Sequence, residues 1–295
     1  MFKLISPLYF IFMACFILFS SPLYAAVSVL DDKHNTVTLA RPAQRIISLA
    51  PHITETLFAA GAGNKIIGVS AYSDYPEEAK KITHVGGYPS LDLEKIISLK
   101  PDLVIAWASG KREQIEKLKA FGLSVFYSEP RYPRDIADTI ERFGILAGTT
   151  KIANKSSKEF MHHYNTLKKQ YAAKTKVKVF YQVWDQPMMT VSSKHLISSI
   201  IELCGGENVF GGLTALTPQI SLESVLAARP EVIVSGGAGK TGSLWKKEWE
   251  AWPEVPAVRN GQLYFIDPSL MQRVGPRILQ AADKLCEDLE HARKQ

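Results

Sequence analysis

One phrase of this sequence occurs twice. Residues 91–107 read LDLEKIISLKPDLVIAW, and residues 220–236 read ISLESVLAARPEVIVSG. Each copy predicts a short helix, a break at its proline and a buried strand, because the residue before proline avoids the helical region and a continuous apolar run follows. A helix followed by a strand is the unit of an α/β fold. Two copies therefore favour two similar lobes over a single domain with a helical insertion.

The rest of the chain supports an α/β fold with mainly parallel sheets. Short β-branched runs alternate with helical patterns from residue 46 onward, and the alternation starts again at residue 177. Between these halves, residues 151–175 carry apolar side chains at helical spacing. We predict two Rossmann-like lobes joined by a single long helix, with residues 26–133 as the N-terminal lobe, 134–175 as the linker helical region and 176–295 as the C-terminal lobe.

The first 25 residues have the pattern of a secretory signal peptide. Lys3 is followed by the apolar run LISPLYFIFMACFILF, and a proline and small residues follow before residue 26. A positive start, an apolar middle and small residues at the cleavage site are typical of export signals, whereas an uncleaved anchor helix is the alternative. We therefore expect residues 1–25 to be removed and the rest of the chain to be exported.

The cysteine content agrees with export to an oxidising compartment. Cys15 lies within the predicted signal peptide, so the exported chain keeps Cys204 and Cys286. An even pair in an exported protein favours a disulfide over two free thiols. Metal binding is the weaker alternative, because no second Cys or His pair stands at ligand spacing.

The sequence contains no recognisable catalytic motif. The segment GGAGKTGS at 236–243 ends like a phosphate-binding loop, but Val234 stands where that motif requires its first glycine. The histidines show no metal-ligand spacing, and no nucleophile elbow is present. The formal net charge of +6 comes from dispersed basic residues, which argues against a nucleic-acid partner. We predict that the chain is not an enzyme and has no catalytic residue, metal site or resident cofactor.

Aromatic residues stand at predicted strand ends in both halves. Trp107 ends the strand of the first repeat, Trp184 ends the strand predicted at 177–184, and Tyr72 ends the segment IIGVSAY. Tyr88 lies in the turn HVGGYPS. Ligands of parallel α/β lobes bind at the carboxyl ends of the strands. A single aromatic residue is more often a packing residue, but several at strand ends indicate a site for a large, flat, apolar ligand.

Each repeat places a glutamate at the second position of its predicted helix. Asp92 and Ser221 are the predicted capping residues, and Glu94 and Glu223 follow them. Taken singly, each carboxylate is explained by the positive end of the helix dipole. Taken together on two similar lobes, the glutamates indicate a two-point contact with a symmetric, basic partner.

Several segments resemble one group of transport proteins. The opening RIISLAPHITETLFAAGAGNKIIGV is similar to the periplasmic substrate-binding proteins that serve ABC importers of cobalamin, haem and iron siderophores. YSDYP, the two repeats and LCGGENVF are similar to the cobalamin-binding members of this cluster. The resemblance covers essentially the whole exported chain. It implies a periplasmic protein, monomeric when free, that captures cobalamin between its lobes and delivers it to an ABC permease dimer in the inner membrane.

The resemblance also implies roles for individual residues. Glu94 and Glu223 match glutamates that pair with permease arginines, and Cys204 with Cys286 matches the family disulfide. The second lobe departs from the family pattern at VWDQPMMT and at Thr217, so we expect Trp184 and Met189 to supply apolar surface there. The expected ligand contacts are Tyr72, Tyr88, Trp107, Trp184, Met189 and Arg273.

Two other functions remain as alternatives. A haem or iron-siderophore binder of the same cluster is the second hypothesis. An anionic siderophore requires several converging basic residues, and the predicted cleft loops offer mainly Arg131 and Arg273. An exported hydrolase or lyase is the third hypothesis, and it lacks any nucleophile with a neighbouring base.

Overall fold

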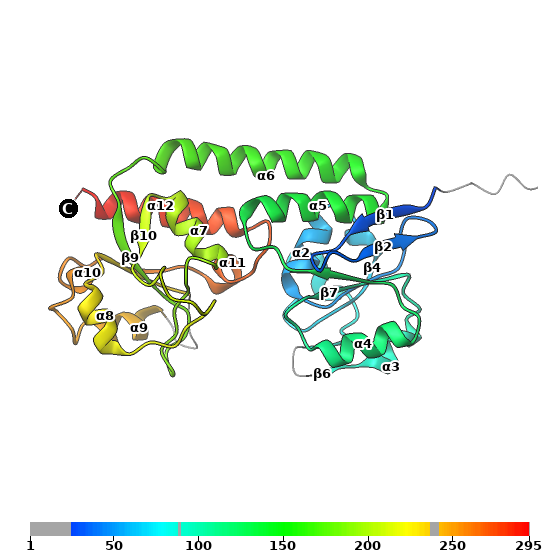
Figure 1. The fold of residues 1–295 in the computed structure, drawn as a ribbon, viewed down its shortest axis with the longest axis horizontal. Coiled ribbons are helices and arrows are strands. Elements are labelled where there is room, and N and C mark those ends of the chain that lie inside the picture. Colours follow the sequence, from blue (N-terminus) through cyan, green and yellow to red (C-terminus); the bar gives the residue numbers. More distant parts are fainter. Residues whose placement is uncertain (1–24, 88–89, 237–241, 295) are drawn as a thin grey trace, which may run out of the picture.

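The computed structural model describes residues 25–87, 90–236 and 242–294. Two α/β lobes lie side by side and are bridged by helix α6 (Thr150–Tyr171), as Figure 1 shows. The predicted fold class is therefore confirmed. Residues 1–24 of the predicted signal peptide, Tyr88 and residues 237–241 of the glycine-rich segment lie outside the described residues.

The N-terminal lobe is built on a parallel sheet of four strands. Its order is β4-β3-β7-β8, and all three neighbouring pairs are parallel. An antiparallel hairpin of β1 and β2 precedes this sheet. The elements are β1 (Val27–Leu30), β2 (Thr36–Leu39), β3 (Ile46–Ser48), α2 (Pro51–Ala59), η1 (Gly63–Lys65), β4 (Ile66–Val69), η2 (Glu77–Lys81), β5 (Gly86–Gly87), β6 (Ser90–Leu91), α3 (Leu93–Ser98), β7 (Leu103–Trp107), α4 (Arg112–Ala120), β8 (Val125–Ser128) and α5 (Pro133–Ala147).

The C-terminal lobe repeats this plan. Its parallel sheet has the order β10-β9-β11-β12. Trp245 and Trp249 are buried and both donate their indole N–H to Oε1 of Gln182, so they are packing residues. The elements are β9 (Val177–Gln182), α7 (Leu196–Leu203), β10 (Gly206–Asn208), α8 (Leu222–Ala228), β11 (Val232–Ser235), α9 (Gly242–Trp249), α10 (Pro256–Arg259), β12 (Leu263–Phe265), α11 (Pro268–Met271) and α12 (Ile278–Ala292).

The two copies of the repeated phrase have the same local structure. Residues 92–101 and 221–230 show one and the same order of exposed, partly buried and buried positions. Each helix is capped by a side chain, since Asp92 accepts from the Lys95 N–H at 2.9 Å and Ser221 accepts from the Ser224 N–H at 3.3 Å. The predicted helix, break and strand are confirmed in both lobes.

The break between helix and strand is sharper than the sequence predicts. Lys100 and Arg229, the residues before the two prolines, both adopt left-handed backbone conformations, with φ of 47° and 48°. This conformation is uncommon for residues other than glycine. The prolines account for the end of each helix, and the left-handed residue turns the chain toward the following strand.

The copies differ at their last position. Trp107 ends β7 in the first lobe, whereas Gly236 follows β11 in the second. A Cβ atom on Gly236 would collide with the side chains of Tyr181 and Gln272. A side chain at the position where the first lobe carries tryptophan would therefore require Tyr181 and Gln272 to move.

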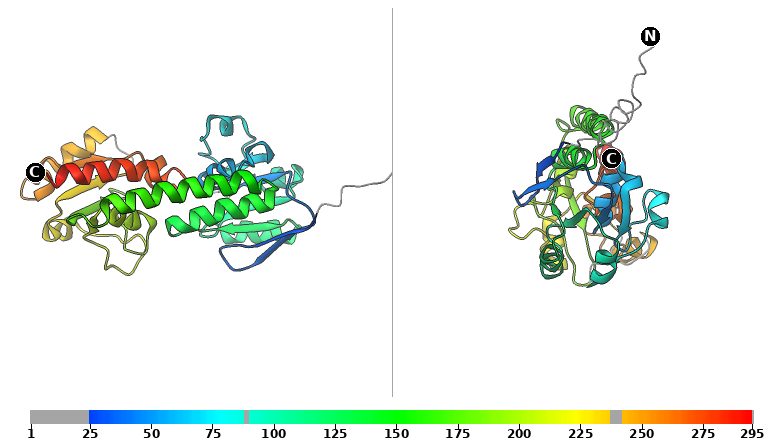
Figure 2. Two further views of the ribbon diagram at one scale, coloured as in Figure 1. Left: turned by 90° about the horizontal axis from the view of Figure 1, so that it is seen from above. Right: turned by 90° about the vertical axis from the view of Figure 1, so that its right-hand side faces the viewer.

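The predicted long helix is α6, which has 22 residues and a length of about 33 Å. Figure 2 shows it from above, running along the long axis over both lobes. It contacts α2 and α5 of the first lobe and α7 and α12 of the second. The predicted linker region 134–175 also contains all but the first residue of α5, which packs along α6, so this region has two helices and not one. Gly148, with φ of 69°, ends α5 and allows the turn between the two helices.

The predicted disulfide is present. Cys204 and Cys286 are joined by an S–S bond of 2.04 Å and are fully buried. The bond links the end of α7 to the middle of α12. Among the described ranges, no helix is long and apolar enough to cross a membrane.

Candidate functional site

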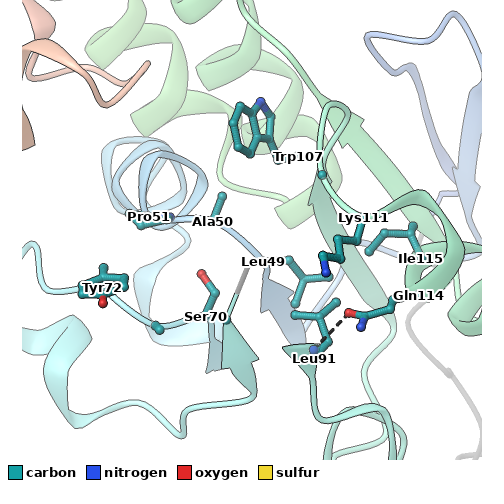
Figure 3. A pocket seen from close by; sticks show the side chains of 13 residues that line it. Leu49, Ala50, Pro51, Ser70, Tyr72, Leu91, Trp107, Lys111, Gln114 and Ile115 are labelled. Atoms are coloured by element: carbon teal, nitrogen blue, oxygen red, sulfur yellow. Dashed lines mark hydrogen bonds between the residues drawn. The ribbon is translucent and has the colours of Figure 1, made fainter. Parts of the chain in front are cut away.

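A cavity of about 140 Å³ opens where three parallel strands of the first lobe end. Leu49 follows β3, Ser70 follows β4 and Trp107 ends β7. Figure 3 shows Tyr72 and Trp107 on separate strand ends around Ala50, with Lys111 and Gln114 of the α4 region on another side. The carboxyl edge of a parallel sheet is the usual place for ligands in α/β folds, and this cavity lies there.

Tyr72 is held in an unusual position. Its side chain is 80% exposed and its backbone is left-handed, with φ of 64°. Neighbouring backbone bonds fix this loop, since the Ala71 N–H donates to the Gly86 carbonyl at 2.7 Å and the Ser70 N–H donates to the Ser48 carbonyl at 2.9 Å. A bulky residue in this conformation is strained, and such strain concentrates at binding sites.

Trp107 presents its ring at the same edge. It is 37% exposed and makes an edge-on contact with the His52 ring at a centroid distance of 6.0 Å. Its carbonyl accepts from the Gly110 N–H at 2.9 Å, which closes a tight turn directly after the strand. Tyr72 and Trp107 together supply two partly exposed aromatic rings, the chemistry expected for an apolar, planar ligand.

The remaining predicted ligand contacts do not line this cavity. All of its lining residues belong to the first lobe, and Trp184, Met189 and Arg273 belong to the second. Tyr88 lies outside the described residues. The structure therefore brings together Tyr72 and Trp107, and it places the other described residues of the predicted set elsewhere.

Trp184 does not end a strand, contrary to the prediction. Strand β9 stops at Gln182, and Trp184 lies two residues later in a loop that returns to Met189. The Met189 N–H donates to the Trp184 carbonyl at 3.0 Å, and the Trp184 indole donates to the Gln186 carbonyl at 3.2 Å. Trp184 is 47% exposed in this loop, and Met189 is half-buried.

Arg273 lies where the lobes touch. Its Nη1 donates to Oε1 of Glu55 at 3.0 Å and to Oδ1 of Asp74 at 2.6 Å. The bond from Arg273 holds the pKa of Asp74 below its ordinary value. The guanidinium is thus engaged by two carboxylates of the first lobe. Sequence reasoning missed both carboxylates, because their partners lie about two hundred residues away along the chain.

Glu94 and Glu223 are exposed at equivalent positions of the two lobes. Figure 1 shows their helices, α3 and α8, on the side of the molecule that is opposite to α6. A hydrogen bond from Ser221 lowers the pKa of Glu223, so this carboxylate is ionised at neutral pH. The pair agrees with a two-point contact on one side of the molecule.

Two other residues of the cavity were missed from the sequence. Lys111 precedes α4 and extends an exposed, cationic side chain beside the apolar surface. Gln114 accepts a hydrogen bond from the Leu91 N–H at 3.0 Å, which ties α4 to the β5–β6 hairpin. Helical periodicity could have placed Gln114 and Ile115 on one turn, but it could not have shown that this turn borders the strand ends.

Two histidines, the buried His52 and the partly buried His195, predict a loss of stability in acid. Burial, together with the charge of Arg273, lowers the pKa of His52 from 6.5 to about 4, and burial lowers that of His195 from 6.5 to about 4. Between these values the unfolded chain binds protons that the folded chain excludes, so the free energy of unfolding falls as pH falls. We expect each histidine to remove about 2 kcal/mol between pH 7 and pH 5.

Urea unfolding at both pH values measures this loss. Nδ1 of His195 accepts from the Ile197 N–H at 3.1 Å and caps α7, a role that asparagine also fills. His195→Asn should therefore keep the cap and remove about half of the pH dependence. Equal pH dependence in the variant and the unaltered protein would contradict the assignment.

Comparison with known proteins identifies the family. The family model described as "Periplasmic binding protein" matches residues 46–270. The chain belongs to this family. It is 40% identical over 250 residues to the vitamin B12-binding protein of Vibrio vulnificus (strain CMCP6), which covers 84% of this chain and 90% of that one. It is 37% identical to the vitamin B12-binding protein of Yersinia pestis (strain Pestoides F), over 92% of this chain and 94% of the relative.

Solved structures agree with the fold. The periplasmic vitamin B12-binding protein BtuF of Vibrio cholerae superposes with a TM-score of 0.79 at 36% identity, over 86% of this chain and 99% of that one. The periplasmic haem-binding protein HutB of Vibrio cholerae superposes with a TM-score of 0.74 at 21% identity, over 83% of this chain and 98% of that one. At this lower identity the likeness shows the fold alone. Binding proteins of this family serve transport.

Proposed function

We propose that this protein captures cobalamin between its two lobes and delivers it to the permease dimer of an ABC transporter in the inner membrane. One observation carries the proposal. The cavity at the strand ends is apolar and bears the rings of Tyr72 and Trp107, in a chain 36–40% identical to proteins named for vitamin B12 binding. A corrin ring is large and flat, and aromatic rings bind such a surface well.

The proposed site extends to both lobes. Trp184 and Met189 supply apolar surface from the second lobe, Tyr88 adds a further ring and Arg273 lies at the boundary. Glu94 and Glu223 are the proposed contacts with the permease. The protein acts in the periplasm after removal of residues 1–25, is monomeric when free and performs no catalysis. The proposed parts are residues 26–133, 134–175 and 176–295.

Titration with cyanocobalamin tests the proposal. We expect a single site that is saturated at micromolar ligand, measured by calorimetry on the purified protein. Absence of binding under these conditions would overturn the cobalamin proposal. Tighter binding of haem than of cyanocobalamin in a parallel titration would favour a haem-binding function instead.

Trp107→Ala should weaken binding of cyanocobalamin about tenfold or more. An aromatic contact contributes about 0.5–1.5 kcal/mol in addition to the burial of its apolar area, and tenfold in Kd corresponds to about 1.4 kcal/mol. The matched control is Phe121→Ala, which removes a 65% exposed ring just after α4, outside the cavity. Equal Kd values for the two variants would exclude Trp107 from the site.

A further inference from the structure

Four charged side chains join the two lobes, between helix α2 of the first lobe and the segment that leads from α11 to α12 of the second. Glu55 on α2 accepts from Arg273 Nη1 at 3.0 Å, from Arg277 Nε at 2.9 Å and from Arg277 Nη2 at 2.6 Å. Asp74 accepts from Arg273 Nη1 at 2.6 Å. We call Glu55, Asp74, Arg273 and Arg277 the inter-lobe cluster. Its two carboxylates belong to the first lobe and its two guanidinium groups to the second.

The inter-lobe cluster has no net charge, and three of its four side chains are shielded from solvent. Its formal charges sum to zero, and the side chains of Glu55, Arg277 and Arg273 are only 2%, 14% and 16% exposed. The Tyr75 ring lies 3.9 Å from Cζ of Arg277 and covers it. Buried ion pairs with several hydrogen bonds hold one geometry, because moving either partner leaves a charge without compensation. The contact therefore resists changes in the separation of the lobes.

The inter-lobe cluster shares a loop and a helix with the cavity that bears Tyr72 and Trp107. Asp74 lies two residues after Tyr72 on the same loop. Glu55 lies on α2, the helix whose first residue, Pro51, lines the cavity. His52 of that helix contacts the Trp107 ring, and its backbone lies against Gly275, between the two arginines. Movement of the arginines relative to the first lobe would thus disturb the loops that carry both rings.

We propose that the inter-lobe cluster sets the separation of the lobes, and that Glu55 and Arg277 are positioning residues for ligand binding. This proposal rests on the proposed function. With the cluster intact, the surfaces of both lobes are held at one distance before the ligand arrives. A preorganised site loses less conformational entropy on binding, so the benefit is a slow dissociation of the ligand. Arg273 acts here through its carboxylate partners, and contact between Arg273 and the ligand stays a separate prediction.

The distance between the lobes in the free protein provides the first test. Cys204 and Cys286 are bonded to each other, so spin labels attach to cysteines introduced at the exposed positions Lys119 and Lys247. We expect Glu55→Gln to widen the distribution of label distances at least twofold in pulsed EPR. The control is Asp138→Asn, which removes an exposed carboxylate paired with Arg134 on α5, and its distribution should not change.

The second test separates positioning from general damage. In Glu55→Gln we expect the dissociation rate of cyanocobalamin to rise about tenfold and the association rate to change less than threefold. Asp74→Asn removes the more exposed carboxylate, which is 50% exposed, and should change both readouts in the same direction but less. This milder variant decides the question if Glu55→Gln does not fold.

Each outcome is decisive. An unchanged distance distribution in a folded Glu55→Gln or Asp74→Asn variant would overturn the positioning role. The distance measurement needs no ligand, so it stands even if the unaltered protein does not bind cyanocobalamin. Failure of the unaltered protein to bind cyanocobalamin would overturn the proposed function. The EPR distances alone would then decide whether the inter-lobe cluster holds the lobes.

Discussion

We expect cobalamin uptake to be lost when Glu94 and Glu223 are both replaced with alanine, while the purified double variant binds cyanocobalamin as tightly as the unaltered protein. This is the result that we expect if the two exposed glutamates are contacts with the permease. Both lie at equivalent positions of α3 and α8, away from the cavity of Tyr72 and Trp107. Rim charges steer and orient a partner, so their loss affects docking and leaves the ligand site intact.

Transport of labelled cobalamin into proteoliposomes that contain the cognate transporter measures this effect. Each single variant should retain part of the transport, because the other lobe still docks. The matched control is Glu113→Ala, which removes an 81% exposed glutamate of α4 and should transport normally. Loss of ligand affinity in the double variant, or full transport by it, would contradict the docking role.

Removal of the disulfide should lower the free energy of unfolding by about 4–5 kcal/mol. Cys204 and Cys286 are separated by 82 residues, and closing a loop of this length restricts the unfolded chain by about that amount. Alanine is the better replacement at both positions, because a serine hydroxyl buried there would add the cost of an unpaired polar group.

Urea denaturation followed by far-UV circular dichroism measures the difference between Cys204→Ala/Cys286→Ala and the unaltered protein. Reduction of the unaltered protein with dithiothreitol serves as the control, since it breaks the same bond without changing a residue. The two losses should agree within about 1 kcal/mol. A loss below about 1 kcal/mol in both cases would show that α12 is held to α7 by packing alone.

Most strands and helices could be predicted because hydrophobic periodicity is a local property. The repeated phrases predict α3, β7, α8 and β11, and the caps at Asp92 and Ser221 follow from residue type alone. The disulfide could also be predicted, because Cys204 and Cys286 are the two cysteines that follow the predicted signal peptide. Each of these inferences uses neighbouring residues or a count.

The parts that could not be predicted depend on where the lobes meet. Glu55 and Arg277 are separated by 222 residues, and no local pattern relates them. The run VKVFYQVW predicts a strand that reaches Trp184, yet β9 stops at Gln182, whose amide oxygen accepts from the indoles of Trp245 and Trp249. Tertiary contacts decide such boundaries, and they are absent from a single segment of sequence.

The crowding around Gly236 constrains how the two lobes can evolve. The lobes carry the same helix, cap and strand, so a substitution that copies Trp107 into the second lobe looks like a single step. It is not, because Tyr181 and Gln272 already occupy the space that any side chain at position 236 would need. The asymmetry of the two lobes is therefore difficult to reverse, and drift at position 236 alone cannot restore a second tryptophan.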